Sequence, residues 1–243
     1  MNHRWNHLET ALPRSVLMKP KQVWQPAFYT PQISKVSDGD DVIAFAEHFL
    51  RLTKGVKAHQ PLVFTDWQQW LLRALLERNK QGRLRYKRAL IGLPRKQGKS
   101  LLGSALALYG LFAGEAGAEV YSAAGDRQQA RIVFEEAKQQ ILQSPALMGE
   151  CKIYRDAIEV PSTNAVYRVL SSDGKLAQGL NPSLVIFDEL HVQRNDDLYD
   201  ALTLGSGARL DPLVVAITTA GYDLESLCGR LYQYSKQVAA GEV

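Results

Sequence analysis

The sequence is poor in cysteine and contains no long hydrophobic run. Two cysteines, Cys151 and Cys228, occur among its 243 residues, too few for a disulfide framework or a self-contained zinc site; we expect both to be ordinary thiols. The longest nearly apolar stretch, residues 101–113, is shorter than the roughly 20 residues that span a bilayer. The N-terminal residues carry charges instead of an apolar segment with a cleavage site, so no secretory signal is expected. These absences predict a cytosolic protein without a membrane partner.

The composition is that of one folded domain without a strong charge imbalance. Hydrophobic residues make up 46% of the chain and charged residues 22%, which argues against disorder and fibrous repeats. A chain of this length suits a single α/β domain. Lysine plus arginine exceed aspartate plus glutamate by four, 29 against 25. This balance permits contact with nucleic acid but does not require it.

Residues 1–40 are predicted to form an extended N-terminal arm. Four of the ten prolines lie there, among interleaved basic and aromatic residues: Arg4, Trp5, Arg14, Lys19, Lys21, Trp24, Phe28 and Tyr29. Such a segment can follow nucleic acid or a neighbouring subunit, or it can pack across its own domain. We favour packing.

The main domain is predicted to cover residues 41–243. Apolar residues recur at helical spacing in residues 40–52 and 66–79, so a helical lead-in is expected over residues 41–86. The predicted strands that follow are 89–93, 119–123, 166–171, 183–187 and 213–218, and the predicted helices are 98–113, 127–142 and 224–239. This alternation predicts an α/β fold, with a mostly parallel central sheet and helices on both faces.

A phosphate-binding loop is predicted between the first of these strands and the next helix. Residues 92–100 read Gly-Leu-Pro-Arg-Lys-Gln-Gly-Lys-Ser. Gly98 lets backbone N–H groups approach phosphates, Lys99 can reach the β and γ oxygens, and the Ser100 hydroxyl can bind Mg²⁺. The candidate nucleotide-binding residues are Pro94, Arg95, Lys96, Gln97, Gly98, Lys99, Ser100 and Leu101. The usual spacing would place the first glycine at position 93, where Leu93 stands, so an unusual loop shape is expected.

Two adjacent carboxylates, Asp188 and Glu189, end the apolar strand at 183–187. Asp188 is placed to hold Mg²⁺ directly or through water, and Glu189 to orient and deprotonate an attacking water. On its own, this segment would be interpreted as a strand that ends in a solvated acidic turn. Combined with the phosphate loop, it predicts that residues 41–243 form a P-loop ATPase domain that uses ATP and Mg²⁺.

Two further segments are candidates for the same site. Thr218 and Thr219 end another buried strand, where their hydroxyls can sense the γ-phosphate or the attacking water, or simply cap the strand. Trp67 and Gln68 lie on the helix before the loop. A glutamine amide can pair with the adenine edge and an aromatic ring can stack on it, although aromatic residues at helical spacing are more often part of a core.

Taken together, the Trp67-Gln68 pair, the phosphate loop, the Ile-Phe-Asp-Glu-Leu-His segment at 186–191 and the Thr-Thr-Ala-Gly segment at 218–221 resemble the large terminase subunit of tailed double-stranded DNA bacteriophages. The resemblance covers roughly residues 60–235 and implies an ATPase of the additional-strand, catalytic-glutamate class. It implies that Gln68 contacts adenine, Lys99 and Ser100 bind phosphate and Mg²⁺, and Asp188 holds the metal. Glu189 is then the catalytic base, with Thr218 and Thr219 as the coupling motif.

The resemblance also implies partners and a location. Such a protein moves double-stranded DNA into a procapsid in the host cell cytoplasm, with a portal protein, a small terminase subunit and a homo-oligomeric ring. Family members carry a C-terminal nuclease domain that this chain is too short to hold, so we expect no nuclease activity from it. Ring motors of this kind usually need an arginine that stabilises charge on the transferred phosphoryl group. Arg95, Arg127 and Arg131 are the candidates.

Two other interpretations stay open. The Asp-Glu-Leu-His string followed by Thr-Thr-Ala also resembles the first motor domain of superfamily-two helicases. A nucleotide-gated binding module without turnover is a non-enzymatic alternative, against which Glu189 argues because a pure switch needs no catalytic base. Exposed basic residues that are candidates to face DNA are Lys54, Lys57, Arg83, Arg85 and Lys87.

Overall fold

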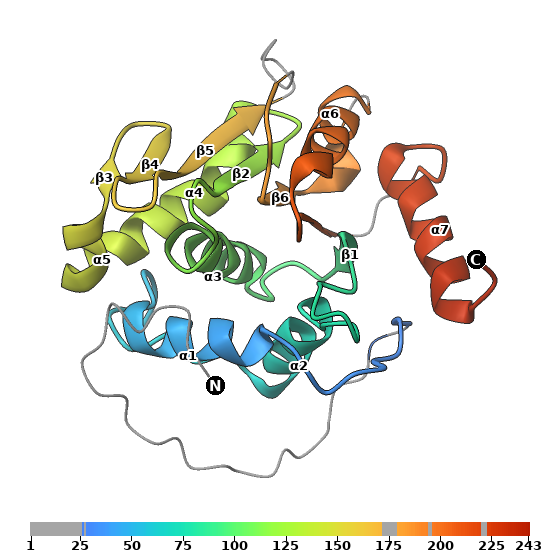
Figure 1. Cartoon of the computed structure of the whole chain (residues 1–243), viewed down its shortest axis with the longest axis horizontal. Helices are drawn as coiled ribbons and strands as arrows, with labels where there is room; N and C mark the ends of the chain where they lie inside the picture. Colours follow the sequence, from blue (N-terminus) through green and yellow to red (C-terminus); the bar gives the residue numbers. More distant parts are fainter. Residues whose placement is uncertain (1–25, 27, 172–178, 194–195, 220–222) are drawn as a thin grey trace.

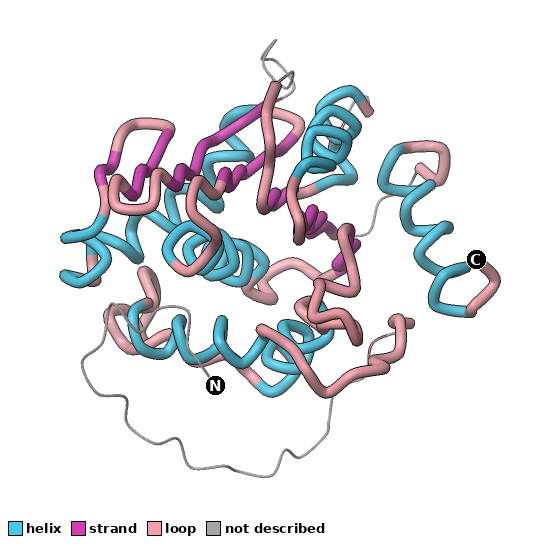
Figure 2. The backbone as a smooth tube through the Cα atoms, viewed as in Figure 1, coloured by secondary structure: helices cyan, strands magenta, loops and turns pink. Residues whose placement is uncertain are grey.

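One twisted sheet runs through the middle of the molecule, between two layers of helices (Figure 1, Figure 2). The computed structural model describes residues 26, 28–171, 179–193, 196–219 and 223–243. Within them seven strands form one sheet in the order β1-β7-β6-β2-β5-β4-β3. The strands are β1 (Arg88–Gly92), β2 (Glu119–Ala124), β3 (Lys152–Ile153), β4 (Ala157–Val160), β5 (Ala165–Ser171), β6 (Leu184–Asp188) and β7 (Leu213–Thr218).

The sheet is mostly parallel, as predicted. Strands β1, β7, β6, β2 and β5 pair parallel to one another, while β4 and β3 extend the sheet beyond β5 as antiparallel strands. Strand β7 is inserted between β1, which leads into the phosphate loop, and β6, which carries the two carboxylates. This inserted strand is the feature that the additional-strand class predicts.

The central strands are buried on both faces, which explains their continuous apolar sequences. Every residue of β6 and β7 is buried. Successive side chains alternate between the faces. Val215 and Ile217 therefore pack in one hydrophobic core together with Ile186, whereas Val214 and Ala216 belong to a second core.

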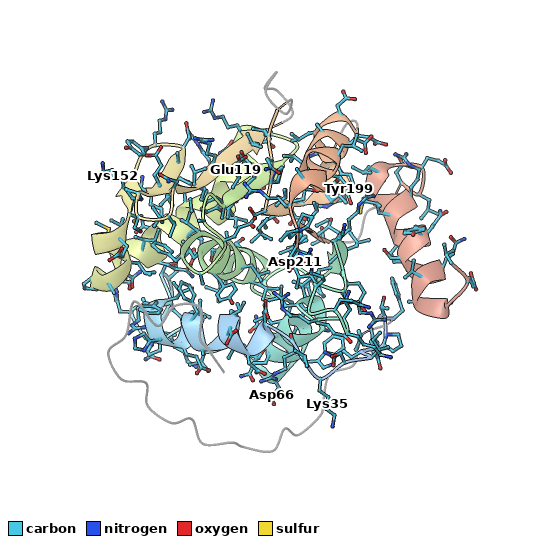
Figure 3. The ribbon with its side chains drawn as sticks, viewed as in Figure 1. Lys35, Asp66, Glu119, Lys152, Tyr199 and Asp211 are labelled. Carbon is cyan, nitrogen blue, oxygen red and sulfur yellow. The ribbon has the colours of Figure 1, made fainter. Side chains whose placement is uncertain are left out.

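Helices cover both faces. They are α1 (Gly39–Phe49), α2 (Asp66–Leu75), α3 (Lys99–Phe112), α4 (Arg127–Leu142), α5 (Pro145–Glu150), α6 (Asp197–Gly205) and α7 (Leu227–Ala240), with 3-10 turns η2 (Leu190–Val192) and η3 (Ser206–Ala208). Residues of α3 and α4 pack in the first core, and α1 and α2 lie beyond α3 (Figure 1). Residues of α6, η2 and α7 pack in the second core, where the ring centroids of Tyr199 and Phe187 lie 5.6 Å apart. Tyr199 of α6 is labelled in Figure 3. No described helix is long and apolar enough to cross a membrane.

The described end of the N-terminal arm packs on its own domain. The rings of Tyr29 and Trp70 meet edge to face with centroids 5.3 Å apart, and Phe28 meets Tyr232 of α7 in the same way at 5.4 Å. The backbone N–H groups of Ile33 and Ser34 both donate to the carboxylate of Glu77. The first 25 residues of the arm and residue 27 lie outside the described part.

Several elements differ from the sequence prediction. The second helix was expected to run to Asn79, but α2 ends at Leu75 because the next residues bind the arm: Arg78 N donates to Val36 O at 2.8 Å, and Ser37 forms a β-bridge with Glu77. Helices α5 and α6 and the β3–β4 hairpin were not predicted. Both cysteines are free thiols, as expected.

Candidate active site

The predicted site residues come together because three parallel strands end at one edge of the sheet. Gly92 at the end of β1 pairs with Thr218 at the end of β7, and Asp188 at the end of β6 pairs with Ile217. Two backbone hydrogen bonds continue these pairings past the strand ends, from Leu93 N to Thr218 O at 2.9 Å and from Glu189 N to Ile217 O at 2.8 Å. The loop after β1 and the turn after β6 are therefore both fixed to β7.

The phosphate loop reaches α3 through two residues in left-handed conformation. Lys96 has φ 64° and Gly98 has φ 77°. The side chain of Leu93 is buried in the core, which explains how a leucine stands where a glycine was expected: the left-handed turn lies further along the loop. The N-cap residue of α3 is Gly98, which has no side chain with which to cap the helix. The first N–H groups of α3 and the positive end of its dipole are thus directed into the loop, an arrangement suited to phosphate oxygens.

Gln68 connects this loop to the start of α2. Its Oε1 accepts hydrogen bonds from Thr65 N at 3.0 Å and from the Thr65 hydroxyl at 3.1 Å, and its Nε2 lies 3.1 Å from the point where a Cβ would stand on Gly98. Gln68 is buried, and the neighbouring Trp67 is half-buried and packs against the first core. The amide oxygen thus orders the start of α2, while the amide nitrogen lies beside the loop.

The loop lysine and the predicted base are in contact. Lys99 Nζ lies 2.9 Å from Glu189 Oε1. The second oxygen, Glu189 Oε2, accepts from Thr219 N at 3.2 Å and from the Thr219 hydroxyl at 3.3 Å, and lies 3.2 Å from His191 Nδ1. Glu189 itself has left-handed backbone torsions, with φ 49°, which are uncommon for a residue other than glycine and recur at functional sites.

The two adjacent carboxylates have opposite pKa shifts. Burial and the nearby charge of Glu189 raise the pKa of Asp188 to about 6, against the lowering effect of Lys99. Burial also raises the pKa of Glu189, but the Lys99 ammonium, the Thr219 N–H and His191 outweigh it and hold that pKa below its usual value. Glu189 is therefore an ionised carboxylate at neutral pH, and Asp188 is a buried carboxylate whose charge is only partly compensated.

This donor set fits a magnesium ion. Mg²⁺ prefers hard oxygen ligands and is usually held by one or two protein groups together with water and substrate phosphates. Asp188 supplies a buried carboxylate at the end of β6, and Ser100 supplies a hydroxyl in the first turn of α3, directly after the phosphate loop. The buried, undercompensated charge of Asp188 is the feature that a cation would stabilise.

Comparison with known proteins decides the family. The model of the terminase large subunit ATPase domain matches residues 66–237, from the first residue of α2 into the last helix, and includes every predicted site residue. The chain belongs to this family.

Individual terminases agree with the match. The large terminase subunit of Enterobacteria phage HK97 is 34% identical over 188 residues, which cover 74% of this chain and 36% of the relative. The terminase large subunit of Lactococcus phage p2 is 30% identical over 153 residues, 60% of this chain and 28% of the relative. The crystal structure of the HK97 large terminase superposes with a TM-score of 0.73 and 28% identity over 85% of this chain and 42% of the other. The chain therefore spans about a third of the length of these curated relatives.

The remaining candidate residues of this terminase ATPase domain lie on the phosphate loop and on helix α4. Pro94, Arg95, Lys96 and Gln97 are exposed on the loop. Arg127 and Arg131 both donate hydrogen bonds to the carboxylate of Asp156. Arg127 Nη2 donates at 2.7 Å and Arg131 Nε at 2.9 Å. Of the three arginines proposed to reach the transferred phosphoryl group, Arg95 is thus the one for which the described residues provide no acidic partner.

Sequence reasoning did not include His191 among the site residues. Its Nδ1 lies 3.0 Å from Thr218 Oγ1 as well as 3.2 Å from Glu189, and its backbone N–H donates to the same hydroxyl at 3.3 Å. Thr218 is buried, and its own hydroxyl donates to Thr219 O at 2.9 Å. The signal was present in the Asp-Glu-Leu-His string of the sequence, three residues after Asp188.

Proposed function

We propose that this chain is a Mg²⁺-dependent ATPase domain of a terminase large subunit, which uses ATP hydrolysis to move double-stranded DNA into a viral procapsid in the host cell cytoplasm. The observation that carries the proposal is the meeting of Lys99, Asp188 and Glu189 at one sheet edge, in a chain of the terminase ATPase family. An ATPase fold alone supports many activities; the match to the terminase ATPase family supports DNA packaging as the activity.

The proposed roles follow from the chemistry of each group. The N-terminal N–H groups of α3 and the ammonium of Lys99 bind the phosphates of ATP, which draws Lys99 away from Glu189. Ser100 and Asp188 would hold Mg²⁺, which would supply positive charge to offset the negative charge of the phosphates. Gln68 and Trp67 contact the adenine. Pro94 to Gln97 and Leu101 complete the loop around the phosphates.

Glu189 acts as the base in the proposed hydrolysis. A water oxygen forms a bond to the γ-phosphorus, the bond between that phosphorus and the β–γ bridging oxygen breaks, and ADP leaves with the electron pair of that bond. The water proton passes to Glu189 Oε1, the oxygen that faces the loop lysine. Thr218 and Thr219 couple this step to strand β7, and Arg95 is the candidate for an arginine that stabilises the transferred group.

We also propose the partners of this domain. A portal protein, a small terminase subunit and further copies of this chain in a ring would complete the motor, with double-stranded DNA as the polymer that is moved. Three of the five basic residues considered for DNA contact already form ion pairs: Lys54 pairs with Glu136, Arg83 with Asp211 and Arg85 with Glu77. Lys57 and Lys87 remain the candidates for phosphate contacts.

The test is steady-state phosphate release with ATP and Mg²⁺ at high protein concentration. Glu189→Gln and Lys99→Ala should both abolish turnover, with ATP still bound by the Glu189 variant. Lys152→Ala is the matched control, because Lys152 is an exposed lysine on β3, at the opposite end of the sheet from β1 (Figure 3). Turnover that survives in Glu189→Gln would overturn the mechanism, whereas ATP binding without turnover in the wild type would favour the nucleotide-gated module.

The choice of DNA separates the packaging motor from a helicase. The same assay with intact duplex, single strands and forked DNA should show the strongest stimulation by intact duplex. A preference for single strands or forks would instead support the helicase interpretation.

A further inference from the structure

His191 contacts both the carboxylate of Glu189 and the side chain of Thr218 at the end of strand β7. Its Nδ1 is 3.2 Å from Glu189 Oε2 and 3.0 Å from Thr218 Oγ1, with the Thr219 hydroxyl at 3.5 Å. We propose that His191 is a positioning residue for ATP hydrolysis, which fixes the orientation of Glu189 and links it to β7. This inference rests on the proposed function.

The hydrogen-bond network determines which group donates. The Thr218 hydroxyl gives its proton to Thr219 O at 2.9 Å, so its oxygen can only accept from His191. The carboxylate of Glu189 faces the Lys99 ammonium at 2.9 Å and accepts the Thr219 N–H at 3.2 Å, so it is also an acceptor for His191. His191 Nδ1 must therefore carry the proton, and it donates between two acceptors. Neutral histidine then has its Nε2 unprotonated.

This arrangement makes the two oxygens of Glu189 unequal. Oε2 is surrounded by three donors, the N–H and hydroxyl of Thr219 and the Nδ1–H of His191. Oε1 is directed to Lys99. A carboxylate oxygen whose lone pairs already accept hydrogen bonds is a poor proton acceptor. Once Lys99 binds phosphate, Oε1 is therefore the oxygen that can receive the proton of the attacking water.

The same contacts provide a path from the phosphate loop to the base. Leu93 at the start of the loop donates its N–H to Thr218 O, and the Thr218 side chain contacts His191. Thr218 is buried with 3% exposure, so it cannot move without its neighbours. A shift of the loop on phosphate binding is thus transmitted through Thr218 to His191, which holds Oε2. Within the described residues the side chain of His191 contacts Glu189, Thr218 and Thr219, so its proposed effect on hydrolysis passes through Glu189.

The experiment uses substitutions matched in shape. His191→Asn keeps a donor where Nδ1 stands, His191→Gln places its amide nearer the position of Nε2, and His191→Leu fills the space without a donor. We expect His191→Leu to lower kcat by about tenfold to a hundredfold, below the roughly 10²- to 10⁴-fold contribution of a complete general base, with the ATP dissociation constant changed less than about twofold. His191→Asn should recover kcat to within about threefold of wild type, and His191→Gln should not.

Thr218→Val supplies a second readout. It keeps the shape of the side chain and removes the hydroxyl that accepts from Nδ1. If the two residues act together, combining it with His191→Leu should lower kcat little beyond the larger single effect. Additive losses, or equal losses in His191→Asn and His191→Leu at unchanged melting temperature, would overturn the positioning role.

Wild type and Glu189→Gln in the same series keep the two proposals distinguishable. Turnover that Glu189→Gln abolishes and His191→Leu leaves unchanged would reject the role of His191 while the proposed function stands. Turnover that is absent in wild type, or unchanged in Glu189→Gln, would reject the proposed function and the inference with it.

Discussion

Lys99 Nζ and Glu189 Oε1 are 2.9 Å apart, so the phosphate loop and the acidic strand are joined by an ion pair between the two residues that ATP hydrolysis would have to separate. Both side chains are largely shielded from solvent, with 10% and 23% exposure. In the proposed mechanism a triphosphate replaces Glu189 as the partner of Lys99. The ion pair would then oppose nucleotide binding and keep the proposed base occupied until binding occurs.

Glu189→Gln is consequently expected to bind ATP more tightly than wild type while it loses turnover. Removal of the carboxylate frees Lys99 and removes a negative charge near the phosphates. We expect the dissociation constant to fall by about threefold to tenfold, equivalent to roughly 0.6 to 1.4 kcal/mol. Isothermal titration calorimetry with ATP measures it, and Glu242→Gln, an exposed site at the end of the chain, is the control. Equal affinity in wild type and Glu189→Gln would show that the ion pair does not oppose binding.

Asp188→Asn is expected to stabilise the fold at neutral pH. The pKa of Asp188 is raised to about 6, first by burial and then by Glu189. Between about pH 4 and 6, Asp188 is protonated in the native protein but ionised in the unfolded chain. The stability of the native protein that depends on this carboxyl is therefore fully present below pH 4 and is lost as the pH rises through 6. The loss amounts to about 3 kcal/mol at most.

Urea unfolding of both proteins at pH 5 and pH 8 measures this difference. The advantage of Asp188→Asn in the free energy of unfolding should be larger at pH 8. Because other carboxylates titrate in both proteins, the difference between them isolates Asp188. Glu150→Gln, which changes an exposed carboxylate, should show no such trend. An advantage that is the same at both pH values would contradict the assigned pKa.

Gln68→Glu and Gln68→Ala are expected to separate the structural role of Gln68 from recognition of the base. Glutamate keeps an oxygen for the N–H and hydroxyl of Thr65 but removes the amide nitrogen beside Gly98. We expect Gln68→Ala to lose about 1 kcal/mol of stability and Gln68→Glu much less.

Both variants should lose preference for ATP over GTP if the amide recognises adenine. The ratio of the two dissociation constants is the proper measure, since any repulsion between the new carboxylate and the triphosphate affects both nucleotides equally. A ratio that stays at the wild-type value in both variants would remove Gln68 from adenine recognition and leave it as a helix cap.

Glu77→Ala is expected to destabilise the protein and release the arm. Glu77 is fully buried, pairs with Arg85 at 2.8 Å and accepts the N–H of Ile33 at 2.7 Å. Loss of one partner from a buried ion pair costs about 3 to 5 kcal/mol. Denaturant unfolding should show a loss of this size, and limited proteolysis should cut residues 28–38 faster. Proteolysis at the wild-type rate would mean that the aromatic contacts alone hold the arm.

The pH dependence of the Glu77 contribution has the opposite sign to that of Asp188. Burial raises the pKa of Glu77, but Arg85 and the two backbone N–H groups outweigh it and hold the pKa below its usual value. The stabilisation is therefore present at neutral pH and lost as pH falls through that lowered pKa. The stability gap between wild type and Glu77→Gln should accordingly shrink when the protein is measured at progressively lower pH.

The sequence was most informative where local signals and burial agree. The bounds of α4 were predicted correctly because Asp126 caps its first N–H groups and apolar residues follow at helical spacing. Those of β7 were correct because five consecutive apolar residues and Thr218 are all buried. The arrangement of Lys99, Asp188 and Glu189 followed from the rule that parallel strands present their ends at one edge of a sheet.

Other features depend on contacts that a linear pattern does not contain. The β3–β4 hairpin consists of strands of two and four residues at the edge of the sheet, too short for a periodic signal. Helix α2 stops early because Glu77 and Arg78 bind the arm, which lies about forty residues earlier in the chain. His191 was quoted as part of a motif, but its contact with Thr218 exists only once β6 and β7 are neighbours.

The position of β1 at the rim of the sheet has a consequence for how the chain folds. Its neighbouring strand within the described sheet is β7, which lies more than a hundred residues later in the sequence. Pairings over such a separation form slowly, because a long loop must close before any contact is gained. A growing chain therefore carries the phosphate-loop sequence long before it can hold its shape. The nucleotide site is among the last parts to mature, and any chain that ends before Leu213 lacks the strand on which the loop is built.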